Sequence, residues 1–184
     1  LRLRLKDKIN IIAVSSINKL KAKDWDNCNK NGNVFLSYNF LKLLEDSNSI
    51  GGNTGWQPVY FCLKVNYKIT AIVPSFIKYH SQGEFVFDHS WAQAYQSLGL
   101  NYYPKLLIAS PFSPVTGKRI LVTQNINTLI KKKLFDFIKD FCKEKKISSI
   151  HINFFEEYEL EFLKNEGFLI RYGEQFHFTN NRYN

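Results

Sequence analysis

The sequence has few cysteines and no long apolar run, and each shortage excludes a class of protein. The three cysteines, Cys28, Cys62 and Cys142, are odd in number, far apart and without Cys-x-x-Cys spacing. This argues against a disulfide framework and against a cysteine-based zinc site, so we expect a reducing, cytoplasmic environment. The longest apolar runs, such as residues 11–14 and 120–122, fall far short of the roughly 18 residues of a membrane helix. The N-terminal residues alternate charged with apolar side chains, so we expect no signal peptide.

Length and composition fit one soluble globular domain that spans residues 1–184. The chain has 184 residues, of which 45% are hydrophobic and 22% charged, and no repeat or linker divides it. Its net charge of +9 favours anionic partners such as phosphates, nucleic acid or acidic lipid. The excess is mostly lysine in a chain crowded with Asn, Ile and Phe, a mix that codon bias also produces, so charge alone decides little.

The hydrophobic periodicity alternates between strand and helix along the chain. It predicts strands at residues 8–14, 58–65, 68–79, 84–88, 105–110, 149–155 and 169–178, and helices at residues 16–28, 37–46, 91–98, 125–146 and 156–166. Asn66 and Tyr67 fit a hairpin turn between the second and third strands. Because strands and helices alternate in the second half, we expect an α/β fold with parallel strands and right-handed crossovers.

This element order is similar to the GNAT acyltransferase fold, most clearly from Lys105 to Phe178. Several short phrases resemble the Fem-like predicted N-acyltransferases, a bacterial family associated with peptidoglycan biosynthesis. They lie at residues 35–41, 54–58, 79–88, 91–95, 102–106, 111–117 and 175–177. The resemblance implies a mixed, twisted sheet of six or seven strands, with helices on both faces and a splayed parallel strand pair in the centre. It also implies two GNAT-like halves, of which this chain resembles the first, with residues 179–184 beginning the connection to a second module.

Acyl transfer needs a base for the amine, a nearby donor carbonyl and a hydrogen-bond donor for the oxyanion. The resemblance places the acyl donor where strand 105–110 diverges from strand 149–155, and it implies acyl-CoA or aminoacyl-tRNA as that donor. The implied donor-binding residues are Ser110, Thr116, Gly117, Lys118 and Arg119. The chain departs from the coenzyme A pattern because residues 111–125 contain one glycine and two prolines, which leaves both donors open.

Polar residues beside apolar strands are the catalytic candidates. Asp88 and His89 are positioned to orient or deprotonate an amine; alternatively, Asp88 caps the following helix and His89 is a solvated turn residue. His151 is a candidate base, or else a hydrogen-bonded core histidine. The substrate-binding candidates, each of which has a structural alternative, are Trp56, Trp91, Tyr95, Tyr103, Lys105, Asn153, Gln175 and His177. The four histidines have no metal-binding spacing, so we expect no metal.

Three functions remain open at this point. The leading hypothesis is an N-acyltransferase module with an amine-bearing acceptor in a cleft formed by residues 88–103. The second is a non-catalytic recognition domain whose active centre lies in a second module or a partner chain. The third is tRNA or RNA binding through the lysines of helix 125–146, which otherwise form a solvated face.

Overall fold

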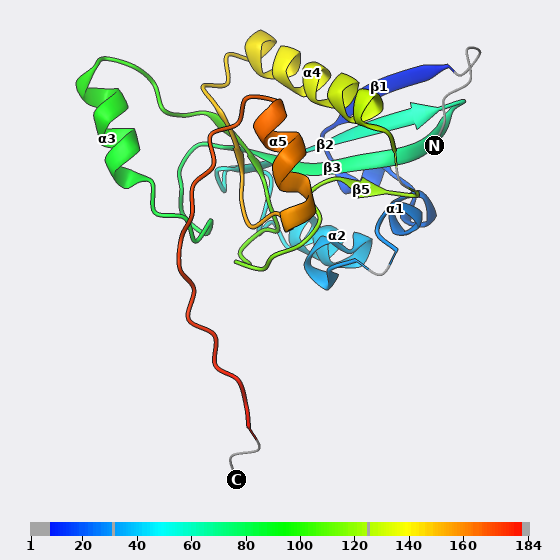
Figure 1. Ribbon diagram of the computed structural model, residues 1–184, viewed down its shortest axis with the longest axis horizontal. Helices are drawn as coiled ribbons and strands as arrows, with labels where there is room; N and C mark the ends of the chain where they lie inside the picture. The colour runs from blue at the N-terminus through cyan, green and yellow to red at the C-terminus, as the bar shows by residue number, and fades with distance from the viewer. Residues whose placement is uncertain (1–7, 31, 125, 182–184) are drawn as a thin grey trace.

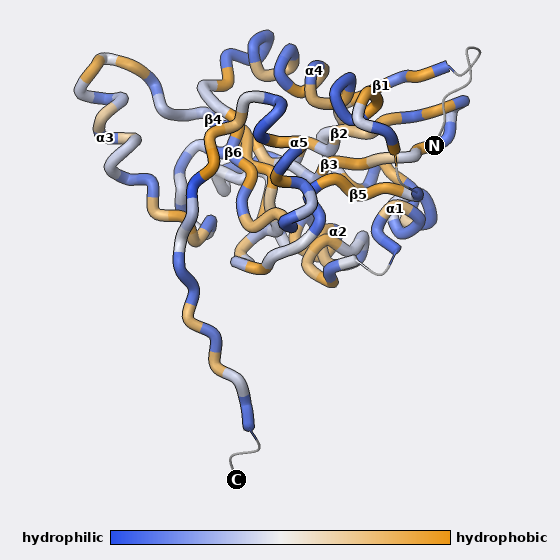
Figure 2. Tube along the Cα trace, in the orientation of Figure 1, coloured by the Kyte–Doolittle hydropathy of each residue, from blue (hydrophilic) through white to orange (hydrophobic). Residues whose placement is uncertain are grey.

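The protein forms a mixed six-stranded sheet, described here from a computed structural model that covers residues 8–30, 32–124 and 126–181. The sheet order is β1-β2-β3-β4-β6, and β5 pairs with β3 (Figure 1; β4 and β6 are labelled in Figure 2). The strands are β1 (Ile9–Val14), β2 (Trp56–Val65), β3 (Lys68–Lys78), β4 (Lys105–Ile108), β5 (Leu121–Val122) and β6 (Ile150–Ile152). The α/β class that the sequence predicts is therefore confirmed.

Helices cover both faces of this sheet. The α-helices are α1 (Ala22–Cys28), α2 (Tyr38–Asp46), α3 (His89–Ser97), α4 (Thr128–Glu144) and α5 (Leu160–Asn165), and the 3₁₀ helices are η1 (Ile17–Lys19), η2 (Val34–Leu36) and η3 (Glu157–Glu159). In Figure 1, α4 and α5 lie on one side of the sheet and α1 and α2 on the other, whereas α3 stands apart from the body. No helix in the described part of the chain has the length and apolar character of a membrane span.

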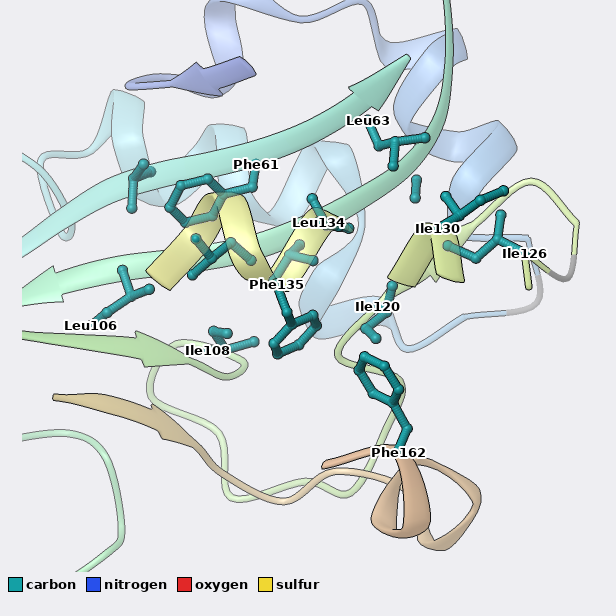
Figure 3. Close-up of a cluster of buried hydrophobic side chains, with 14 of the residues drawn as sticks. Phe61, Leu63, Leu106, Ile108, Ile120, Ile126, Ile130, Leu134, Phe135 and Phe162 are labelled. Atoms are coloured by element: carbon teal, nitrogen blue, oxygen red, sulfur yellow. The ribbon is translucent and has the colours of Figure 1, made fainter. Parts of the chain in front are cut away.

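Alternation along β2 supplies both hydrophobic cores. Phe61 and Leu63 belong to the cluster under α4, while Tyr60 and Cys62 belong to the cluster under α1 and α2. Side chains of consecutive strand residues point to opposite faces, so a strand covered on both sides reads as a continuous apolar run. Figure 3 shows the α4 core, in which Phe61 and other sheet side chains meet α4 and α5. Figure 2 shows the same apolar runs along the central strands.

Strand β3 has two partners along one edge. After the predicted hairpin turn, in which Asn66 and Tyr67 have φ values of +49° and +68°, β3 pairs first with β5 and then with β4. Positive φ at both central residues is typical of the two-residue hairpin turn, so that prediction is confirmed. The chain between β4 and β5, residues 109–120, leaves the sheet and returns; we call it the excursion.

Strands β4 and β6 form the expected parallel pair, at one edge of the described sheet rather than in its centre. Leu106 to Ile108 pair with Ile150 to Ile152, and the Asn153 amide donates to the Ile108 carbonyl at 3.1 Å. The strands then separate, and Gly117, returning from the excursion, takes the place beside Phe155. We call the point where β4 and β6 separate the fork.

Two predicted strands are wrong. Residues 84–88 turn instead of extending: Phe85 has a φ of +57°, and Glu84 and Asp88 are buried while Phe87 is exposed. Residues 169–181 contain neither helix nor strand and run away from the body as a largely exposed extended segment (Figure 1). Alternating apolar residues predict a strand in both segments. A strand also has to pair with a neighbouring strand, and the residue pattern does not show whether one is available.

Smaller differences concern helix bounds. The predicted helix at residues 16–28 is divided into η1 and α1. The predicted start of the long helix, Asn125, lies outside the described residues, and α4 begins after Asn127, whose side chain accepts from the Ile130 amide. The two-residue β5 was not predicted, since its length is below what periodicity can detect.

Candidate functional site

Two lysines and two carboxylates are buried together where β3 ends and β4 begins. Lys78 and Lys105 are cross-strand partners and both are fully buried. Like charges directly opposite one another destabilise a sheet unless they are compensated. Glu84 and Asp88, which are 4% and 3% exposed, supply that compensation from the turn after β3. These four side chains are called the ionic cluster below.

Lys105 is the centre of the ionic cluster. Its Nζ lies 2.9 Å from Glu84 Oε2 and 2.5 Å from Asp88 Oδ2. Lys78 Nζ is 3.8 Å from Glu84 Oε1, donates to the Gln82 carbonyl at 3.1 Å, and lies 3.5 Å from the centroid of the Trp56 ring. The cluster therefore pairs two lysines with two carboxylates in a site that is well shielded from water.

Burial and neighbouring charges shift the pKa values of these groups in different directions. Burial lowers the pKa of Lys78 to about 7, although Glu84 acts in the opposite direction. Burial also raises the pKa of Glu84. Burial alone would raise the pKa of Asp88, but hydrogen bonds, the first from Lys105, bring it down to about 2. Asp88 is thus a carboxylate at neutral pH, held by its cation.

Two tyrosines connect the ionic cluster to the surface. The Tyr102 hydroxyl donates to Asp88 Oδ2 at 2.7 Å. The Lys105 ammonium donates to Ser81 Oγ at 2.7 Å, and Ser81 Oγ is 2.7 Å from the Tyr103 hydroxyl. Both phenol groups therefore turn inward.

His151 lies on the same face of the sheet, beside Tyr102. The two ring centroids are 5.9 Å apart, and His151 Nε2 is 2.9 Å from Ser149 Oγ. Burial, followed by the charge of Lys105, lowers the pKa of His151 to about 4. The imidazole is therefore neutral at pH 7 and has the lone pair that a proton acceptor requires.

A cavity of about 460 Å³, the α3 cavity, opens beside the two tyrosines. Its walls are His89, Ala92, Gln93 and Gln96 on one side and residues 100–103 on the other.

Two buried polar groups without partners lie beside the fork. Ser110 is 3% exposed and Asn153 is 8% exposed, and neither Ser110 Oγ nor Asn153 Nδ2 has a hydrogen-bond partner among the described residues. A buried polar group that is left unpaired costs about 1–3 kcal/mol, so these two groups are candidates for contact with a bound molecule or a water. Both groups are able to donate a hydrogen bond to a carbonyl or oxyanion.

The excursion is held by charged groups that point inward. Arg119 donates through Nε to the Asn153 carbonyl at 2.7 Å and through Nη2 to the Val115 carbonyl at 2.6 Å. The Glu159 carboxylate accepts from the amides of Arg119 and Ile120 at 3.1–3.2 Å. These contacts leave the Arg119 guanidinium buried and give it a structural role.

The fit of a diphosphate at the fork is poor. The amide of Gly117 is used by the Phe154 carbonyl at 3.0 Å, and α4 begins only after β5, at the other end of the β3 edge. The N-terminus of α4 therefore lies away from the fork. A second cavity of about 300 Å³ does bring Thr116, Gly117 and Lys118 together, with residues 32–33 and Glu156 on its other side.

The structure brings some of the predicted site residues together and separates others. Asp88, Lys105, Tyr103 and His151 form one region. Trp56 is buried beneath Lys78. Tyr95 packs on Tyr102 at 5.2 Å, whereas Trp91 is half-exposed on α3 and outside the cavity lining.

Other predicted site residues lie outside this region or differ from their predicted role. Gln175 and His177 lie on the exposed C-terminal segment, where Gln175 donates to the Pro114 carbonyl at 3.0 Å. Asp88 precedes α3, but its side chain makes no capping bond, so the helix-cap alternative is wrong. Lys105 is the first residue of β4, and Ser110 lies just beyond its last residue. The two residues are therefore about 16 Å apart along the strand direction.

Sequence reasoning missed Lys78, Glu84, Ser81 and Tyr102. The available signal was a lysine at the end of each of two apolar strands, β3 and β4, because a lysine at the end of a buried strand needs a carboxylate. Among the described residues, no group of three or more His, Cys, Asp or Glu side chains is arranged to hold a metal ion.

Comparison with known proteins agrees with this architecture. The model of the FemAB-like family, described as peptidoglycan biosynthesis/recognition, matches residues 16–184. Among solved structures, the chain is similar to an aminoglycoside N-acetyltransferase, AAC(6')-Iy, in complex with CoA. The TM-score is 0.55 at 11% identity, and the match covers 99% of this chain and 100% of that one. No curated protein matches the chain. At this identity the structural match supports the fold alone.

Proposed function

Because the chain belongs to the FemAB-like family, we propose that it is an N-acyltransferase module that transfers an acyl or aminoacyl group to an amine. The observation that carries this proposal is the fork, where two parallel strands separate beside the unpartnered Ser110 Oγ and Asn153 Nδ2. The expected second module remains a prediction.

The proposed reaction is an acyl substitution. The amine nitrogen attacks the donor carbonyl carbon, a C–N bond forms, and the C–S bond of a thioester or the C–O bond of an ester breaks. The proton lost by the amine ends on the leaving sulfur or oxygen. Asn153 Nδ2 and Ser110 Oγ donate to the oxyanion that develops between these steps.

His151 is the proposed proton acceptor. Asn153 follows the last residue of β6 and lies two residues after His151, so both side chains are expected to leave the same face of the sheet. The low pKa of His151 keeps the imidazole neutral, although it also makes the imidazole a weak base. Asp88 and His89 contribute at the other end of the site, where Asp88 fixes Lys105 and Tyr102 and His89 borders the α3 cavity.

Two donors remain to be separated by experiment. The CoA complex of the structural neighbour makes an acyl-CoA donor reasonable, and the cavity at Thr116–Lys118 is the place for part of it. The engaged amides at the fork and the net charge of +9 favour an aminoacyl-tRNA donor.

The test measures donor binding and transfer with the same protein. Acetyl-CoA is titrated by calorimetry, and transfer to a panel of amines is followed with acetyl-CoA and with aminoacyl-tRNA. Asn153→Ala and Ser110→Ala should each slow transfer, Asn153→Ala by about 10²–10³-fold, because each removes an oxyanion donor. Asn165→Ala, at the exposed end of α5, is the matched control. Absence of heat at millimolar acetyl-CoA together with absence of transfer from either donor would overturn the proposal.

The C-terminal segment favours a second candidate, a recognition domain whose active centre lies in another module or chain. Leu169, Tyr172 and Phe176 are 80–99% exposed. Exposed apolar residues in one stretch are expected where a partner surface is missing. Under this candidate the chain binds an acceptor amine, neither donor is turned over, and Asn153→Ala leaves acceptor binding unchanged.

A further inference from the structure

The segment that carries α3 has almost no exposed charge. We call residues 85–104 the α3 arm; in Figure 1 its helix stands apart from the body. The only Asp, Glu, Lys or Arg in this arm is Asp88, which is 3% exposed and paired with Lys105, whereas such residues make up 22% of the whole chain. Charged side chains are mostly found on protein surfaces, so the composition of this exposed segment needs an explanation.

Helix α3 carries an apolar stripe that it does not bury. Its members follow the i, i+3, i+4, i+7 spacing along one face, opposite the helix residues that line the α3 cavity; they are Trp91, Ala94, Tyr95 and Leu98. Tyr95 packs on Tyr102, but Trp91 and Leu98 are 52% and 74% exposed, and no side chain of α3 is buried. A surface helix normally packs such a stripe against the core, so packing within the protein does not account for it.

Further apolar side chains of the α3 arm are exposed on either side of the helix. Phe85 and Phe87 precede α3 and Leu100 follows it, and each is more than half exposed. Exposed apolar surface of this kind marks a site for another protein or for a membrane. The lack of exposed charge favours the membrane, because charged side chains are costly to bring toward hydrocarbon, whereas protein partners are normally recognised with the help of complementary charges.

Cationic side chains lie at the base of the α3 arm instead of within it. The amide of Ser148 donates to the Pro104 carbonyl at 2.8 Å, which joins the end of the arm to the chain just after α4. Residues 143–146, at the end of α4, are exposed and carry three lysines and one glutamate. Arg171 Nη2 lies 3.4 Å from the carbonyl oxygen of residue 87. Basic residues that border an uncharged, aromatic-rich surface complement the anionic headgroups of a bilayer.

From these features we infer that the α3 arm docks the protein on the surface of an anionic lipid bilayer. The apolar stripe enters the boundary between headgroups and acyl chains, where tryptophan rings such as that of Trp91 are favoured, and the lysines of residues 143–146 contact the headgroups. The arm lies on the bilayer and does not cross it, since the nine residues of α3 span only about 14 Å. The inference is independent of the proposed transfer reaction, because it concerns where the protein binds and not what it transfers.

Trp91 is a built-in reporter for this docking, because the other two tryptophans are already buried. Trp25 and Trp56 are 0% and 2% exposed, so a change in their emission is not expected on docking. The protein is mixed with vesicles of phosphatidylcholine alone and with vesicles of equal parts phosphatidylcholine and phosphatidylglycerol. With the anionic vesicles we expect the protein to co-sediment, the emission of Trp91 to shift to shorter wavelength, and lipids with brominated acyl chains to quench it. Phosphatidylcholine alone should bind more weakly.

Substitution of apolar residues tests whether the α3 arm is the docking face. The double variant Phe87→Ser, Leu98→Ser should weaken binding to the anionic vesicles by about 100-fold, roughly tenfold for each apolar side chain that docking withdraws from water. Both side chains are exposed, so the fold should not change. The matched control is Val34→Ser, Leu43→Ser, which replaces two similarly exposed apolar residues of η2 and α2 and should bind as the parent does.

Substitution of lysines tests the contribution of the headgroup charge. The double variant Lys143→Gln, Lys145→Gln should weaken binding to the anionic vesicles by about 10–25-fold, because each lysine near an anionic surface contributes about fivefold. It should leave binding to phosphatidylcholine unchanged. Lys21→Gln, Lys23→Gln, at two exposed lysines around the start of α1, is the control with the same loss of net charge.

Several results would overturn the inference. The first is that no protein sediments with the anionic vesicles at millimolar lipid. The second is that the protein sediments but brominated chains do not quench Trp91, or the Phe87→Ser, Leu98→Ser variant binds as the parent does; the membrane then meets another face. The third is self-association, measured by light scattering, that this variant abolishes while vesicles bind no protein, which would assign the arm to a second copy of the chain.

Discussion

Replacement of Lys105 by methionine should strongly destabilise the fold. The ammonium of Lys105 compensates Glu84 at 2.9 Å and Asp88 at 2.5 Å, and none of the three residues is more than 4% exposed. Removing one partner of a buried ion pair costs about 3–5 kcal/mol, because the other charge stays buried and unpaired. Asp88 keeps the Tyr102 hydroxyl and Glu84 keeps Lys78, so we expect the lower end, about 3 kcal/mol. For a chain of this size that corresponds to a melting temperature lower by about 6–12 °C.

Urea unfolding followed by tryptophan fluorescence measures this loss, with the slope of the transition as a check that the denatured state has not changed. Lys132→Met is the matched control. The half-exposed Lys132 pairs with Asp136 and lies 3.7 Å from Glu166, which keeps Lys139 at 2.7 Å, so Lys132 should contribute little. Adding Asp88→Asn to Lys105→Met should restore part of the stability, because it removes one orphaned charge. A Lys105→Met protein as stable as the Lys132→Met protein would refute the reasoning that the ionic cluster holds this end of the sheet.

Two further predictions concern His151 and the C-terminal segment. The pKa of His151 is about 4 in the folded protein against 6.5 as the ordinary value, so the unfolded chain takes up this proton first as the pH falls. Its stability contribution is complete above about pH 6.5 and is lost toward pH 4; His151→Gln should flatten the free energy of unfolding between about pH 7.5 and 4.5, and equal slopes in both proteins would contradict this. Truncation after Phe168 should change the unfolding free energy by less than about 0.5 kcal/mol, and trypsin should cut at Arg171 before Arg119. Protection of Arg171, read by mass spectrometry, would mean that the segment is paired.

The sequence predicts those elements in which the pattern of apolar and polar residues follows directly from which faces are buried. The nearly continuous apolar run of β2 follows from burial on both faces, and the three-and-four spacing in α4 follows from burial on one face; both elements were found. Residues 84–88 and 169–178 show the limit of that reasoning. Glu-Phe-Val-Phe-Asp has a strand pattern, yet the two buried lysines draw its carboxylates inward and leave Phe87 outside.

The candidate site could be predicted only in part, because its organising contact is between distant residues. Asp88, Lys105 and His151 were chosen from separate motifs, and the structure places all three around Tyr102. A lysine at the end of a strand is usually solvated, so the position of Lys78 alone does not predict its burial; the pairing of Lys78 with Lys105 across two strands creates the need for Glu84. The burial of Arg119 could not be predicted either, because its partners are backbone carbonyl groups, at residues 115 and 153, which every residue type carries.

Glu159 links the excursion to the start of η3. Its carboxylate accepts hydrogen bonds from the amides of Arg119 and Ile120 in the excursion and from the Glu156 amide at the start of η3. Pushing the excursion outward would therefore pull on η3 and, through it, on α5 and Phe162 in the hydrophobic core. In the proposed transferase, a donor that widens the fork would therefore also have to displace η3 and the core side chain of Phe162.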